Sequence, residues 1–293
     1  MERPKRIFGY IIYCICITAG LLYYLFPSDA VEDFLKVKVQ DLNPSLSISI
    51  GRITPWPLLG LRFTNARILY RDQPAGRLFR AETLVVRPQV VSFLKGTQDW
   101  GFRCTAYGGS VRGSASLNGD AANPVSAEVE LEAIRMGEHK DLRDLIGRSV
   151  EGQLSGTITY TGRGQGVLNG SGEANLRLVD GRIELLSPLL TLESIEYNEV
   201  TIAMVLKRKR VNLTRLDLEG PMLKGTMSGT IRLKEDLEKS SLDLKGRIEP
   251  FPGLFEQAEG ARSVLQFFKG RLRKGALPFR IRGTIAHPRI TFI

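Results

Sequence analysis

The side chains that most often carry chemistry are sparse in this chain of 293 residues, and they do not converge in its sequence. Two histidines, His139 and His287, lie far apart and have no cysteine or histidine neighbour at metal-ligand spacing. Of the three cysteines, Cys14 and Cys16 fall in an apolar run and Cys104 stands alone in the remainder. We therefore expect no metal site, no catalytic residue and no cofactor, and we predict that the protein is not an enzyme.

Motifs that could bind phosphate or act as acid and base also have structural explanations. Glu128, Glu130 and Glu132 alternate along one predicted strand, so we expect them on its polar, solvated face. The glycine-rich segment at 162–166 lies between two predicted strands and does not open a helix, unlike a phosphate-binding loop. The sequence has no nucleophile elbow, Walker loop, zinc-protease motif or dinucleotide-binding fingerprint.

The net charge of +10 does not by itself indicate a nucleic-acid partner, and we predict none. Basic residues are spread along the whole chain, and they are dense only at 207–210 and 271–274. The first of these runs is expected to form the exposed tip of a hairpin. Attraction to anionic lipid head groups fits such a charge better if the protein is held at a membrane.

Residues 7–26 form an uncharged apolar run, which is predicted to be a single transmembrane helix. A helix of that length reaches roughly 30 Å, the thickness of a bilayer hydrocarbon core. Basic residues precede the run and acidic residues follow it, so residues 1–6 are predicted to be a cytoplasmic tail. A cleaved signal peptide is the alternative, but the run is longer than usual and ends in bulky residues instead of small ones.

The rest of the chain predicts a mainly β protein. Ser28 and Asp29 can cap a short helix, so 27–45 is interpreted as a juxtamembrane helix and linker. From 46 onward apolar and polar residues alternate with period two, with a phase slip at Asn65 that a bulge or bend would produce. We predict one β domain over 46–293, built as a long, strongly twisted antiparallel sheet with a few short helices, one of them near 251–269.

A glycine quasi-repeat recurs in the predicted strands as Gly-x-x-x-Gly followed by alternating residues, at 109–117, 152–160 and 225–233. Glycine inside a strand relieves crowding where a sheet bends or where a backbone or ligand comes close. The glycines could serve curvature alone, or they could make room for an apolar guest such as an acyl chain. For the second case the residues expected to line an apolar groove are Ile158, Leu176, Ile202, Ile231, Leu244 and Ile281.

The anchor, the Pro-Trp-Pro-Leu-Leu-Gly-Leu segment at 55–61, the Leu-Val-Val-Arg-Pro segment at 84–88 and the Ala-Tyr-Gly-Gly-Ser-Val-Arg-Gly segment at 106–113 resemble AsmA-like periplasmic proteins. The chain length and second half are more similar to the type II secretion system protein N (GspN) family. The segments that carry this second resemblance are Leu-Arg-Leu-Val-Asp-Gly at 176–181, Leu-Asp-Leu-Glu-Gly at 216–220, Pro-Phe-Pro-Gly-Leu at 250–254 and the stretch at 279–288.

The GspN resemblance implies a Gram-negative inner-membrane protein with one span, a cytoplasmic N-terminus and a periplasmic β domain. It implies a non-enzymatic accessory role in type II protein secretion, with the inner membrane and secretion-system subunits as partners. The AsmA-like resemblance implies a groove or open-barrel-like sheet and, as an alternative function, binding or transfer of phospholipid acyl chains in support of outer-membrane assembly. Neither family supplies catalytic residues to carry over.

Overall fold

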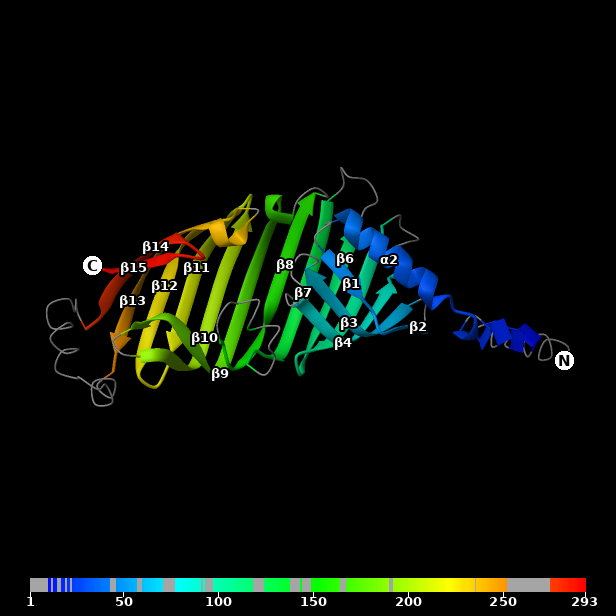
Figure 1. Cartoon of the computed structure of the whole chain (residues 1–293), viewed down its shortest axis with the longest axis horizontal. Coiled ribbons are helices and arrows are strands. Elements are labelled where there is room, and N and C mark those ends of the chain that lie inside the picture. The colour runs from blue at the N-terminus through cyan, green and yellow to red at the C-terminus, as the bar shows by residue number, and fades with distance from the viewer. Residues whose placement is uncertain are drawn as a thin grey trace, which may run out of the picture.

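The computed structural model describes most of the chain in separate stretches. These are residues 10, 11, 13, 14, 17, 18, 20, 21, 23–42, 46–56, 60–70, 77–90, 92, 97–117, 124–137, 143, 149–163, 167–189, 192–234, 236–251 and 275–293. In Figure 1 the N-terminus and the C-terminus lie at opposite ends of an elongated molecule, and the strands run across its long axis.

The strands of the described residues form one antiparallel sheet of 15 strands. The strands are β1 (Leu46–Ser49), β2 (Arg52–Trp56), β3 (Gly60–Tyr70), β4 (Arg77–Pro88), β5 (Asp99–Ala106), β6 (Gly109–Leu117), β7 (Pro124–Arg135), β8 (Gln153–Arg163), β9 (Ser171–Leu189), β10 (Leu192–Lys207), β11 (Arg210–Glu219), β12 (Leu223–Arg232), β13 (Ser241–Pro250), β14 (Leu277–Thr284) and β15 (Pro288–Phe292). From β3 to β15 each strand pairs with its neighbours in sequence.

β1 and β2 both pair with β3 and behave as two halves of one edge strand. Ser49 pairs with Arg67 and Arg52 pairs with Thr64, so the register is the same on both sides of the interruption. Asn65, where the sequence predicts a bulge or bend, lies opposite this break and has a φ of 55°. The phase slip in the sequence therefore coincides with a local distortion of the sheet.

The predicted mainly β class is confirmed, with 70% strand and one long antiparallel sheet. Most predicted strands are present, and the basic run at 207–210 does form the β10–β11 turn, with positive φ at Arg208 and Lys209. Two features exceed the prediction. The sequence predicts a break at 55–60, but β2 continues through Pro55 and Trp56. It predicts strands at 168–179 and 200–206, whereas β9 runs on to Leu189 and β10 begins at Leu192.

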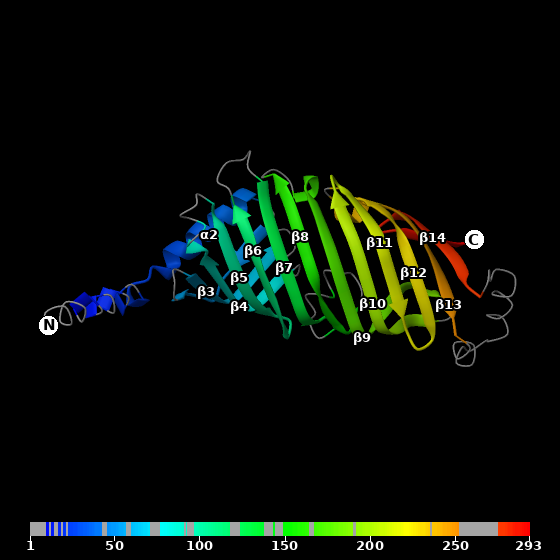
Figure 2. The ribbon, with the colours of Figure 1, turned by 180° about the vertical axis from the view of Figure 1, so that it is seen from behind.

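Helix α2 (Ser28–Leu42) lies over one face of the sheet near the N-terminus (Figures 1 and 2). Val31 and Leu35, one turn apart, pack with Phe26 against the buried cluster of the sheet. On another side, Lys36 forms an ion pair with Glu32 at 3.0 Å, at i,i+4 spacing. The helix is thus held by its apolar contact with the sheet, which is where most helical stability in proteins originates.

Several predicted helices fall on residues that the structure does not describe, or describes only in part. The helix near 251–269 lies outside the described residues except for Phe251. The sequence also predicts a short helical turn at 89–95 and a short helix at 140–146, and the structure describes only scattered positions of both. The predicted span at 7–26 is described in part. Within the described stretches, no helix combines the length and the apolar character needed to cross a bilayer.

Candidate functional site

Cross-strand pairing builds one continuous apolar face across the sheet. Two rows of directly paired residues run from β2 to β15, with one apolar or glycine residue from each strand. The first row is Ile53, Phe63, Leu84, Cys104, Val111, Leu131, Gly156, Leu176, Ile202, Leu216, Met227, Gly246, Phe279 and Phe292. The second row is Pro55, Leu61, Val86, Phe102, Gly113, Val129, Ile158, Ala174, Met204, Leu213, Gly229, Leu244, Ile281 and Ile290.

A third, shorter row runs beside these two from β4 to β15. It consists of Pro88, Trp100, Ala115, Ala127, Tyr160, Gly172, Leu206, Val211, Ile231, Leu242, Gly283 and Pro288. The three rows together are called the apolar face below. Side chains alternate between the two faces of a strand, so the residues between these positions lie on the opposite, outer face.

Bulges keep the apolar face continuous where the alternation in the sequence slips. On β11, Leu213 and Leu216 are three positions apart, so a regular strand would turn one of them to the outer face. The register shifts by one residue between them, and the Thr214 hydroxyl donates a hydrogen bond of 2.8 Å to the carbonyl of Ala203. β7 has a similar shift next to Ala133, whose φ is 51°.

Glycines of the quasi-repeat occupy positions on the apolar face where the backbones come close. Gly156 and Gly229 have φ values of 150° and 148°, which side-chain-bearing residues rarely adopt. A Cβ at Gly156 would overlap the carbonyl oxygen of Asn175, and one at Gly229 would overlap that of Asp243. These two glycines therefore allow strand geometry that another residue would oppose, so the curvature explanation of the repeat is sufficient for them.

Burial along the first row of the apolar face is deepest near β2 to β5 and only partial from β8 onward, whereas in the second row the buried residues are Leu213 and Leu244 of the later strands. In the first row Ile53, Phe63 and Cys104 are 4%, 6% and 2% exposed, and they belong to the cluster that α2 covers. From β8 to β15 every member of the same row is only partly buried, as Leu176 and Ile202 are. The second half of the face thus leaves apolar surface in contact with solvent.

All six residues predicted to line an apolar groove lie on this face. Leu176 and Ile202 belong to the first row, Ile158, Leu244 and Ile281 to the second, and Ile231 to the third. Leu244 is buried and the other five are half-buried. The sequence prediction omitted neighbours such as Met204, Leu213 and Phe279, which the same alternation, corrected for bulges, would have identified. That these residues bind a lipid stays a prediction.

The outer face of the second half is polar, and several of its arginines form ion pairs with carboxylates. Arg177 donates two hydrogen bonds of 2.9 Å to the carboxylate of Glu199, and Arg280 contacts Asp243 in the same two-bond geometry. The hydrogen bonds from Arg177 lower the pKa of Glu199, and those from Arg280 lower the pKa of Asp243. Both carboxylates are engaged with arginine, which does not favour a role as proton acceptors in catalysis.

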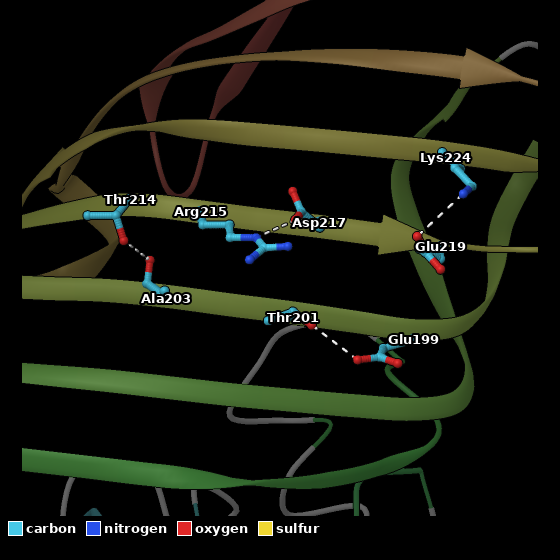
Figure 3. Close-up of polar contacts among 8 residues, drawn as sticks. All are labelled: Glu199, Thr201, Ala203, Thr214, Arg215, Asp217, Glu219 and Lys224. Carbon is cyan, nitrogen blue, oxygen red and sulfur yellow. Dashed lines mark hydrogen bonds and ion pairs between the residues drawn. The ribbon is translucent and has the colours of Figure 1, made fainter.

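Figure 3 shows how this polar network continues over β10, β11 and β12. Glu199 accepts a hydrogen bond of 3.2 Å from the Thr201 hydroxyl, Arg215 is bonded to Asp217 along β11, and Lys224 lies 3.4 Å from Glu219. These groups are mostly exposed and take part in local pairs. Such pairs keep one face of the sheet soluble and add little stability.

Two groups that could be reactive are buried and have structural roles. Burial, with a smaller effect from the charge of Glu82, raises the pKa of the Cys104 thiol to about 11, so it is neutral and a poor nucleophile. Burial also raises the pKa of Tyr197 to about 12, and its hydroxyl donates a hydrogen bond to the carbonyl of Glu151. The Tyr197 side chain thereby ties β10 to the segment that precedes β8.

Chemistry-bearing residues do not converge elsewhere in the described part of the chain. His287 lies in the β14–β15 turn, where its backbone N–H bonds to the Thr284 hydroxyl, and His139 lies outside the described residues. No cluster of three potential metal ligands occurs among the described residues. A concavity of about 520 Å³ beside β5 to β8 is lined largely by polar side chains, among them Asp99, Ser116 and Glu128.

The apolar face is therefore the candidate site, since many of its apolar side chains are only partly buried after the described residues have folded. Comparison with known proteins adds nothing to this assignment. No protein-family model, no curated protein and no solved structure matches the chain.

Proposed function

We propose that the protein is a non-enzymatic, membrane-anchored lipid-binding protein whose sheet holds acyl chains along its apolar face. The observation that carries this proposal is the pair of uninterrupted apolar rows from β2 to β15, most of whose members from β8 onward are only partly buried. Contiguous exposed apolar surface of this kind marks a binding site in a soluble domain. An occupant made of methylene groups fits, because the rows offer shape and apolar contact without paired polar groups.

Energetics support an acyl chain over a polar ligand. Each methylene group taken out of water contributes about 0.8 kcal/mol, so a chain of ordinary length gains several kcal/mol from partial burial along the rows. The half-buried side chains of the face, such as Ile202 and Ile281, would lose their remaining contact with water in the same step. A polar guest would instead leave its hydrogen-bonding groups unsatisfied against these residues.

The placement of the chain ends supports a path that leads away from a membrane. The N-terminal helical residues continue from the β1–β2 end of the sheet, and the C-terminus lies at the other end (Figure 1). At a strand spacing of about 4.8 Å the sheet measures roughly 65 Å across its strands. Anchored at the predicted inner-membrane span, a groove-like sheet of this length would reach well into the periplasm but would need a partner or stacking to bridge two membranes.

Photocrosslinking tests the proposal directly. The full chain, purified in mild detergent, is exposed to phosphatidylethanolamine that carries a diazirine near the end of one acyl chain. We expect crosslinks on peptides of β8 to β14 at apolar-face positions, and a several-fold loss of crosslinking when Ile158, Ile231 and Ile281 are replaced by Asp. The matched control replaces Thr157, Ser228 and Thr291, exposed residues of the outer face, by Asp.

Outcomes of this experiment separate the alternatives. Equal crosslinking of both triple variants, or crosslinks confined to the N-terminal segment, would overturn the lipid-binding role. Circular dichroism and the urea midpoint of each variant establish whether it is folded. If the apolar-face variant does not fold, single Asp substitutions at the half-exposed Ile158 and Ile281 provide the same comparison.

An accessory role in type II secretion is the second candidate, and it rests on the resemblance of the chain length, the single predicted anchor and the second half of the chain to the GspN family. Crosslinking in membranes followed by copurification would test it. Recovery of secretion-system subunits without stoichiometric phospholipid supports the secretion role, whereas recovery of phospholipid without those subunits argues against it. A gene neighbourhood made up of secretion components would be an independent indication.

A further inference from the structure

A cluster of arginines lies on the outer face of the first strands. β1 to β4 contain one acidic residue, Glu82, against the arginines Arg52, Arg62, Arg67, Arg77, Arg80 and Arg87. Ile53, Phe63, Ala66 and Ala81 point into the core, so the alternation puts Arg52, Arg62, Arg67 and Arg80 on the outer face. Within the described part of the chain, none of these four forms an ion pair with a carboxylate.

The arrangement of these arginines is costly without an anionic partner. Arg67 and Arg80 are direct cross-strand partners, and like charges in that position repel. The Nε atoms of Arg62, Arg67 and Arg80 are buried and have no hydrogen-bond partner. A buried donor without a partner, close to a like charge, opposes folding. In the second half of the sheet Arg182 has a carboxylate, Glu196, directly opposite it, but Arg210 and Arg232 face each other there as Arg67 and Arg80 do.

Trp56 adds an aromatic group to the same surface. It lies at the end of β2, on the outer face, and the guanidinium carbon of Arg62 stands 3.7 Å from the centre of its ring. Tryptophan favours the level of lipid head groups, where its ring is apolar and its N–H is hydrated, and arginine favours the phosphates at that level. The edge formed by β1 and β2 is also the end of the sheet from which the predicted anchor departs (Figure 1).

We propose that the outer face of β2 to β4, through Arg52, Arg62, Arg67, Arg80 and Trp56, docks on the anionic phospholipid head groups of the membrane that holds the N-terminal segment. The phosphates supply the negative charge that the sheet lacks, and Trp56 enters the interface beside them. Docking fixes the sheet at the surface of the bilayer, with the β1–β2 edge next to the lipid. This inference concerns the outer face and does not depend on acyl chains binding to the apolar face.

Fluorescence of Trp56 provides the test. The full chain, with Trp100→Phe to leave one indole, is reconstituted into vesicles of phosphatidylcholine alone or with phosphatidylglycerol, each containing a lipid with a spin-label quencher at its head group. We expect quenching in the anionic vesicles to be several-fold stronger than in the neutral ones. At 1 M NaCl the screening length falls to about 3 Å, and quenching should return to the neutral level.

Substitutions separate charge from structure. Arg62, Arg67 and Arg80 changed to Gln should abolish the difference between the two kinds of vesicle, whereas the same three changed to Lys should largely retain it. The control changes Lys207, Arg208 and Arg210 to Gln at the β10–β11 turn, which removes equal charge at a distant turn and should have no effect.

Three results would overturn the proposal. The first is equal quenching in neutral and anionic vesicles, and the second is an unchanged signal in the Gln variant with a wild-type urea midpoint. The third is a change in Trp56 emission on addition of millimolar inorganic phosphate to the protein in detergent, without vesicles, which would assign the arginines to a soluble anion. A loss of quenching in the Lys variant as well would mean that arginine packing, not charge, is responsible.

Discussion

The first and second halves of the sheet have the same alternation of apolar and polar residues, but they differ in how their buried residues are grouped. From β1 to β7 the apolar side chains, with α2 across them, form a cluster that includes ten buried residues. From β8 to β15 the corresponding rows continue without interruption, but the buried residues there are more scattered. Leu178, Tyr197 and Val200 form a small cluster beside the rows, and the other buried apolar residues described are Leu213, Leu223, Leu244, Ala276 and Leu277. One half uses its apolar face to fold, and the other retains part of it in contact with solvent.

The outer faces of the two halves differ in how their arginines are paired. In the second half, arginines and carboxylates are matched across strands, as in the pairs Arg177–Glu199 and Arg280–Asp243. In the first half, Arg67 and Arg80 face each other without a carboxylate. Among the described residues, ion pairs on the sheet are more frequent from β8 to β15 than from β1 to β7, although Arg210 and Arg232 also face each other in the second half. This comparison underlies the two proposals made above, lipid tails on the apolar face of the second half and lipid head groups on the outer face of the first.

The largest expected effect is on the free energy of unfolding. Removing the buried ring of Phe63 should cost much more than removing the partly buried ring of Phe279. Phe63→Ala should lower the free energy of unfolding by about 3–5 kcal/mol, as a cavity forms in the first half. Phe279→Ala, in the same row of the second half, should cost about 1–2 kcal/mol, because its ring is already partly hydrated. Urea denaturation measures both. Equal losses would show that the two halves are packed alike.

The next effect concerns two glycines of one repeat on β12. Gly229→Ala should cost about 1–3 kcal/mol, because its φ of 148° and the nearby carbonyl of Asp243 both oppose a Cβ. Gly225→Ala is the control, since a Cβ there meets only the Cβ of Leu218 at 3.7 Å. The control should be close to neutral in the same denaturation experiment. A costly Gly225→Ala would indicate that open space, and not strand geometry, is what the repeat preserves.

A third test uses the reactivity of Cys104 as a probe of the filled half. In a Cys14→Ser, Cys16→Ser background, maleimide labelling at pH 8 should be at least about a hundred-fold slower in the folded protein than in urea, because the thiol is 2% exposed and its pKa is raised to about 11. A cysteine placed at Ile202, in the half-exposed part of the same row, should react readily. Rapid labelling at position 104 would contradict the filled cluster.

The smallest effect is a pH dependence of the paired outer face. The lowered pKa values of Glu199 and Asp243 mean that their ion pairs contribute stability above the ordinary carboxyl values of 4.5 and 3.8, and that the contribution is lost as the pH falls through the folded values. The double variant Arg177→Gln, Arg280→Gln should therefore be slightly less stable than the wild type at pH 7 and should converge with it in acid. A difference that persists in acid would point to lost packing instead.

The sequence predicts the fold class well because alternation of apolar and polar residues is a local signal. Residues such as Ile158 and Leu176 could be assigned to one face from their spacing alone. The bulges at Ala133 and Thr214 could not, because an extra residue is recognised only when the partner strand is known. The end of β2 was missed for a related reason, since its pairing is also invisible in the sequence. Pro55 suggests a break, and a proline is acceptable there only because β2 lies at the edge of the sheet.

The sequence predicted the apolar character of the candidate site but not how deeply its different parts are buried. A glycine-punctuated apolar face could be anticipated, whereas the difference in burial between its halves depends on where α2 and the neighbouring side chains pack. The unpaired arginines could not be predicted from the sequence either, because Arg67 and Arg80 are brought opposite each other only by the register of β3 and β4. Charge counted along the chain does not reveal which charges are matched.

The strictly sequential order of β3 to β15 has a consequence for how such a chain can form and change. Each hairpin pairs with the one just made, so the sheet can grow from its first strands as the polypeptide emerges, and contacts between distant segments are not needed to begin. A duplicated or deleted hairpin would alter the length by about 10 Å while leaving the rows in phase. Insertion or deletion of hairpins could therefore change the length of the sheet in steps of two strands without changing its architecture.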